Sequence, residues 1–75
     1  MQNITNLNCG ECGEILSIEC VEKIKIRLLE LGFVKGKVVK VLAISSLKKT
    51  YLLEIQNCVI AVRNTILKDI IVCKK

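Results

Sequence analysis

The hydrophobic pattern of the chain has a helical period in one segment and a strand-like pattern on both sides of it. Between Val21 and Leu31, apolar residues recur at positions i, i+3, i+7 and i+10, which is the spacing of one face of a helix. The alternation around Ile26 also fits a strand, but Gly32 follows directly, where a helix favours a residue in the left-handed conformation. The pattern therefore predicts a helix over residues 22–31.

Short apolar runs, bounded by polar or glycine-containing turns, predict the strands. Asn57 separates two of these runs, and asparagine tolerates the backbone conformation of a tight hairpin turn. The polar segment 45–50 is typical of a loop, and the segment 63–68 could form a single helical turn. The expected strands are Glu14–Cys20, Val38–Ile44, Tyr51–Gln56, Cys58–Val62 and Ile70–Val72.

This order of elements predicts a mainly β fold: a small barrel of five to six strands, with one α-helix inserted after the first strand. We expect residues 1–75 to form one domain, because too little chain remains for a layered sandwich and a flat open sheet leaves its edges unguarded. The helix would plug one end of the barrel, and the last strand would close against the first. The expected core positions are Leu7, Ile15, Ile18, Val39, Val41, Ile55, Ile60 and Val72.

Composition supports this fold and narrows the class of partner. Eleven isoleucines and eight valines favour strands, whereas the chain has one Phe, one Tyr and no Trp. The net charge is +5, which allows an acidic protein, a nucleic acid or an anionic membrane as partner without selecting one. Because single-stranded nucleic acids are usually bound on aromatic side chains, we expect no nucleic-acid partner.

The residue types also argue against an enzyme and against a membrane-inserted protein. The chain has no His and a single Asp, and it contains neither a phosphate-binding loop nor a dinucleotide-binding glycine motif. We therefore expect no catalytic residue and no cofactor. The longest apolar run, Cys58–Val62, is far too short to span a bilayer, and the first residues do not resemble a signal peptide. The expected location is the cytoplasm.

The five cysteines are an odd number, which disfavours a disulfide framework in a reducing compartment. Cys9 and Cys12 form a Cys-x-x-Cys pair, which could supply two ligands to a metal ion. A structural zinc ion needs four ligands, and no histidine is present to complete the set. We favour a glycine-containing turn whose cysteines pack as small apolar residues. Cys9 and Cys12 remain the metal candidates, but no metal site is expected.

Two motifs carry a family resemblance: Leu7-x-x-Gly10-x-x-Gly13 and Arg27-Leu-Leu-Glu-Leu-Gly-Phe-Val-Lys-Gly36. With the flanking strands, they resemble the FeoA family of small cytosolic ferrous iron transport proteins over about residues 7–72. The resemblance implies an SH3-like barrel, a fold that also forms the C-terminal domain of iron-dependent repressors of the diphtheria toxin repressor type. The sequence departs from the family in the loop 45–50, which is basic and lacks the usual proline.

The resemblance implies a non-enzymatic accessory protein that docks on the cytosolic GTP-binding region of a FeoB-like membrane permease and modulates it. The alternative is a free-standing metal-responsive or peptide-binding regulatory module, like the barrel domain of the iron-dependent repressors. A homo-oligomer is a further possibility. Arg27 could instead be solvated or paired with Glu30, and Phe33 could instead pack under the helix. The candidate partner-binding residues are Lys23, Arg27, Glu30, Phe33 and Arg63.

Overall fold

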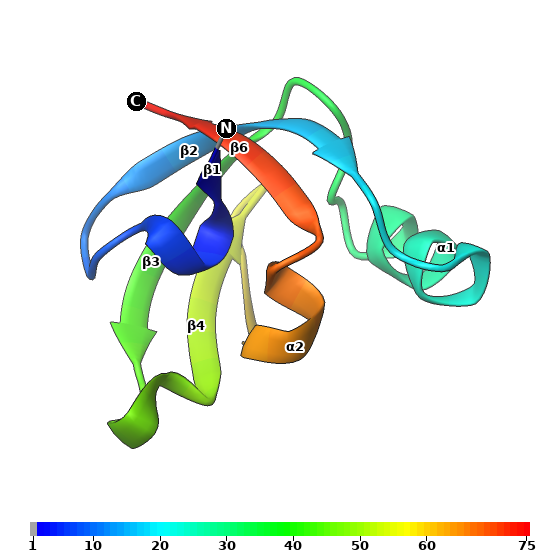
Figure 1. The fold of residues 1–75 in the computed structure, drawn as a ribbon. Helices are drawn as coiled ribbons and strands as arrows, with labels where there is room; N and C mark the ends of the chain where they lie inside the picture. Colours follow the sequence, from blue (N-terminus) through cyan, green and yellow to red (C-terminus); the bar gives the residue numbers. More distant parts are fainter. Residues whose placement is uncertain (1) are drawn as a thin grey trace.

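The structure is a computed structural model that describes residues 2–75 (Figure 1). It contains every strand expected from the sequence, with boundaries shifted by at most two residues at either end, and a short additional strand at the N-terminus. The elements in chain order are β1 (Gln2–Asn3), the 3-10 turn η1 (Ile4–Asn6), β2 (Cys12–Ile18), α1 (Glu22–Glu30), β3 (Val38–Ile44), the 3-10 turn η2 (Ser46–Lys48), β4 (Thr50–Ile55), β5 (Cys58–Arg63), α2 (Asn64–Leu67) and β6 (Ile70–Lys74).

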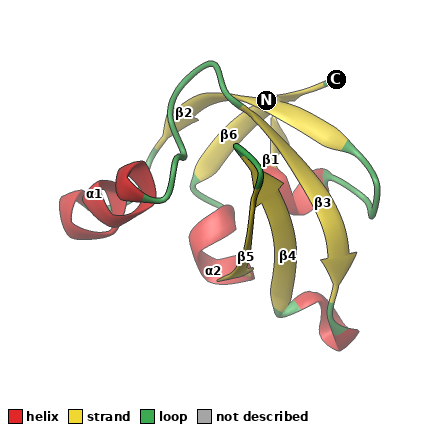
Figure 2. Ribbon diagram, turned by 180° about the vertical axis from the view of Figure 1, so that it is seen from behind, coloured by secondary structure: helices red, strands yellow, loops and turns green. Residues whose placement is uncertain are grey.

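The six strands form one antiparallel sheet in the order β1-β6-β2-β3-β4-β5. The last strand, β6, pairs with β2, which is the first strand expected from the sequence, and Ile15 lies opposite Val72. The register shifts at Leu16 in β2 and at Leu42 in β3, where one strand carries an extra residue. Such bulges bend a strand and increase its twist, which lets this sheet curl into a barrel (Figure 2).

The concave side of the sheet encloses a core made of aliphatic side chains with Phe33 and Tyr51. Among the described residues no polar or charged residue is buried, and the Tyr51 hydroxyl donates a hydrogen bond to the Thr5 carbonyl at 3.3 Å. Most of the predicted core positions are buried, whereas Ile18 and Ile60 are only partly buried against the core.

Helix α1 does not plug the barrel, contrary to the expectation from the sequence. It follows β2 and projects from the side of the barrel (Figure 1). Leu28 is its only buried residue, whereas Val21 and Leu31, at the two ends of the predicted apolar stripe, are 67% and 45% exposed. The short helix α2 instead packs against β5 and η1 and buries Leu67 in the core. The barrel therefore covers only part of the apolar stripe on α1, and both ends of the stripe stay exposed.

A Schellman motif ends α1 and fastens it to the barrel. The Phe33 N–H donates to the Leu28 carbonyl at 3.0 Å, and the Gly32 N–H donates to the Leu29 carbonyl at 3.1 Å. Gly32 has φ +103°, a conformation that costs a residue with a Cβ atom free energy. Phe33 and Leu28 are both buried in the same core cluster, so the hydrogen bonds and the apolar anchor lie together.

Replacing Gly32 should therefore destabilise the fold in proportion to the strain that the new side chain meets. We expect Gly32→Val to lower the free energy of unfolding by more than about 1 kcal/mol, and Gly32→Asn to lower it less, because asparagine tolerates positive φ better. Urea denaturation of both variants measures the difference. Equal stability of Gly32→Val and the wild type would contradict the role of the motif.

The neighbouring valines of β3 offer a matched test of the core. Val39 is 0% exposed and Val38 is 45% exposed, although they lie side by side in one strand. Val39→Ala should cost about 2 kcal/mol of unfolding free energy, since it removes two buried methyl groups and leaves a cavity. Val38→Ala should cost well under half as much in the same denaturation experiment. Similar losses for the two variants would mean that the face of β3 is assigned incorrectly.

Candidate partner-binding groove beside helix α1

A groove with a volume of about 390 Å³ runs between α1 and the corner where β5 leads into α2. On the helix side it is lined by Ile24, Arg27, Leu28 and Leu31. On the barrel side it is lined by Ala61, Val62, Arg63 and Ile66. The groove exists because α1 is held at its C-terminal end and stands away from the sheet, so apolar side chains of both walls stay partly uncovered.

The groove combines an apolar lining with two arginines from opposite walls. Arg27 comes from α1 and Arg63 from the end of β5, and both residues are exposed. No carboxylate lines the groove, and neither arginine takes part in an ion pair within residues 2–75. Such a surface suits a partner segment that offers apolar side chains together with an acidic group.

Arg63 also borders a second, more polar hollow of about 530 Å³, which Lys49 and residues at the start of α2 help to form. The Asn64 N–H donates to the Lys49 carbonyl at 2.9 Å and ties the two sides of this corner together. The positive charge beside the groove therefore extends from Arg63 towards Lys49.

The structure separates the other candidate residues from the groove. Lys23 and Glu30 are exposed on α1 but do not line it, and Glu30 forms no ion pair with Arg27. Phe33 is 0% exposed, so its proposed role as a partner contact is not supported and the packing alternative holds. Its side chain belongs to the core cluster because the turn after Gly32 directs it under the helix.

Sequence reasoning missed the barrel wall of the groove, above all Ala61 and Ile66. These residues are unremarkable in the sequence, since one lies in an apolar strand and the other in a short helical turn. The available signal was the length of the apolar stripe on α1. A stripe that reaches from Val21 to Leu31 exceeds what one barrel end can cover, so part of it had to remain open.

The cysteines form no metal centre within the part of the chain that the structure describes. The Cys9 thiol donates to the Leu42 carbonyl at 3.0 Å, and Cys12 is partly buried in β2. No three His, Cys, Asp or Glu side chains of residues 2–75 lie close enough together to hold a metal ion. Burial, with a smaller contribution from the Asp69 charge, raises the pKa of the Cys20 thiol and favours its neutral form.

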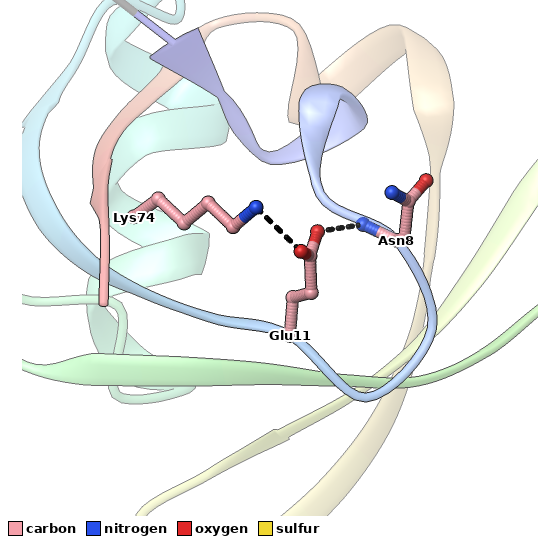
Figure 3. Close-up of polar contacts among 3 residues, drawn as sticks. All are labelled: Asn8, Glu11 and Lys74. Atoms are coloured by element: carbon pink, nitrogen blue, oxygen red, sulfur yellow. Dashed lines mark hydrogen bonds and ion pairs between the residues drawn. The ribbon is translucent and has the colours of Figure 1, made fainter.

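Glu11 fastens the loop that carries Cys9, directly before β2, to the last strand (Figure 3). One carboxylate oxygen accepts a hydrogen bond from the Asn8 N–H at 2.7 Å, and the other lies 2.5 Å from the Lys74 ammonium. Lys74, and to a smaller degree the Asn8 N–H, hold the pKa of the Glu11 carboxyl below its ordinary value of 4.5. The loop is therefore held in place by a charge network on the side of the molecule where β2 and β6 pair.

The antiparallel barrel and its side helix define a small SH3-like domain. The FeoA domain matches residues 2–74, and the chain belongs to the FeoA family. This family is a transport accessory family associated with ferrous iron and is not a known enzyme family. No helix of residues 2–75 combines the length and apolar character needed to cross a membrane.

Solved FeoA structures share this fold. The Stenotrophomonas maltophilia FeoA protein, complexed with zinc and described as a candidate ferrous iron transport activating factor, is 25% identical, with a TM-score of 0.84 over 96% of this chain and 89% of that chain. The Chlorobium tepidum FeoA protein is 23% identical, with a TM-score of 0.91 over 97% and 70% of the two chains. Iron(II) transport protein A from Clostridium thermocellum is 22% identical, with a TM-score of 0.92. The match covers 97% of this chain but only 45% of that protein. No curated protein sequence matches this chain.

The Glu11 network makes stability depend on pH in a defined direction. Because the folded state lowers the pKa of Glu11, its contribution is present above the ordinary value of 4.5 and is lost as pH falls through the folded pKa. We expect Glu11→Gln to unfold more easily than the wild type at neutral pH and equally easily well below pH 4.5. Thermal unfolding across this range at low salt measures the convergence. The control is Glu30→Gln, which removes an exposed carboxylate that belongs to no described ion pair. Its unfolding temperature should stay close to that of the wild type across the whole pH range. A constant gap for Glu11→Gln would contradict the assignment.

Proposed function

We propose that this chain is a non-enzymatic, cytosolic accessory protein of ferrous iron uptake that docks on the cytosolic GTP-binding region of a FeoB-like permease and modulates it. Membership of the FeoA family supports the link to ferrous iron transport. The sequence has no His and no phosphate-binding loop, which supports leaving GTP hydrolysis to the partner.

The observation that carries the docking proposal is that Arg27 and Arg63 line opposite walls of one apolar groove. Two arginines without a carboxylate partner attract an acidic surface and speed the encounter, and the apolar lining supplies the contact that keeps the complex together. A groove of about 390 Å³ holds only a short segment, so the complex should be transient unless contacts form outside it.

The test is a titration of this protein with the purified cytosolic region of the permease, followed by calorimetry at low salt. Arg27→Glu and Arg63→Glu should each weaken binding by at least about tenfold, because each places a like charge against an acidic partner. Lys37→Glu changes the charge by the same amount at an exposed position that does not line the groove, and it should bind almost as the wild type does.

Melting curves show whether the arginine variants remain folded. Because both arginines are exposed, each substitution should move the melting temperature by no more than about 4 °C. Absence of binding by the wild-type protein at high concentration would refute the docking proposal. If Lys37→Glu lost as much affinity as the arginine variants, the loss would come from the change in net charge, and the groove would have no part in binding.

A further inference from the structure

Strand β5 is a free edge of the sheet. The strand order ends at β5 on one side and at β1 on the other, and β1 has only two residues whereas β5 has six. Figure 2 shows β5 beside β4, at the end of the sheet nearest α2. An edge strand presents a row of unpaired N–H and C=O groups that can pair with another strand.

The ladder between β4 and β5 determines which groups of β5 face outward. Thr50 lies opposite Arg63, and the hydrogen bond next to this pair runs from the Asn64 N–H to the Lys49 carbonyl. That arrangement marks Thr50 and Arg63 as a non-hydrogen-bonded pair of an antiparallel ladder. The backbone groups of Arg63 therefore point away from β4.

The same alternation continues along the strand. Ile60 and Val62 direct their backbone groups towards β4, where they lie opposite Leu53 and Tyr51. Ala61, between them, directs its N–H and C=O to the free edge, and no other strand among residues 2–75 pairs with β5.

This hydrogen-bonding edge forms part of the groove beside α1. Ala61 and Arg63 line the groove, and Leu28 and Leu31 form its opposite wall. A chain segment laid along β5 would therefore meet outward-pointing backbone groups on one side and apolar side chains on the other. Arg27 and Arg63 add two positive charges to the same surface.

We propose that the groove takes an extended segment of the partner, which adds to β5 as a further strand and carries alternating apolar and acidic residues. The inference rests on the proposed function and names the chemical class of the segment that docks. Backbone hydrogen bonds to Ala61 give the segment its position. Alternation places every second side chain on one face, so apolar residues can be buried in the groove while acidic residues reach the arginines.

The test is amide hydrogen exchange of the full chain followed by NMR. In the free protein, the Ala61 amide should exchange at least about tenfold faster than those of Ile60 and Val62, which bond to β4. The purified permease region should slow exchange at Ala61 by at least about tenfold at saturation, while Ile60 and Val62 change little. A permease region that binds without protecting Ala61 overturns the inference and leaves the docking proposal standing.

A second probe decides the case in which the permease region does not bind. The peptide acetyl-Glu-Val-Glu-Val-Glu-amide has the proposed alternation and can be added at millimolar concentration. If the peptide protects Ala61, the inference is supported even though the permease region does not bind. If neither the permease region nor the peptide protects Ala61, the inference and the proposed function are both overturned. Protection that appears only with rising protein concentration, together with a dimer mass in sedimentation, would show a second copy as the occupant and overturn the inference.

Substitutions at Ala61 give an independent readout. Ala61→Pro removes the outward N–H, at an edge position where proline is tolerated, and should weaken binding of the permease region and the peptide at least about tenfold. Ala61→Ser keeps the N–H with a side chain of similar size and should bind as the wild type does. Equal binding by the two variants would overturn the inference, and the exchange measurement on the wild type decides it if Ala61→Pro fails to fold.

Discussion

The architecture depends on the antiparallel pairing of β2 with β6, which brings the last strand beside the first long strand of the chain. Gly13 makes the close approach possible, because a Cβ atom there would lie 3.1 Å from the Cβ of Val72 and 3.2 Å from Cδ1 of Leu7. Ile15 and Val72, opposite each other in the same ladder, are both buried. The pairing thus fixes the positions from which the core is built, and the Glu11–Lys74 contact reinforces it from outside.

The strands could be predicted from the sequence because each contains a short run rich in aliphatic residues, bounded by a polar or glycine-containing turn. The turn at Gln56 and Asn57 is an example. Both residues have positive φ, as a two-residue hairpin turn of type I′ requires, and the asparagine made this turn predictable. The two bulges carry no comparable signal. Leu16 and Leu42 are ordinary aliphatic residues, and their displacement follows from curling the sheet into a barrel, a constraint that only the complete sheet imposes.

The position of α1 was the part that periodicity could not determine. An apolar stripe shows that a helix has a face to cover, but not how much of that face its neighbours reach. Here the core reaches Leu28 and stops short of Leu31. The candidate site follows from this mismatch, since Arg27 was recognised on the helix while its counterpart Arg63 became part of one surface only through the path of β5 and α2.

The Schellman motif at Gly32 and Phe33 has a consequence for how such a protein can diverge. The helix is tied to the core through the buried ring of Phe33 and the buried Leu28, and most of its other side chains are exposed. Substitutions along the exposed length of α1 can therefore accumulate without lowering the stability of the sheet. A lineage of such proteins could change the segment that it recognises while keeping its scaffold, because Arg27 and Leu31 line the groove without belonging to the core cluster.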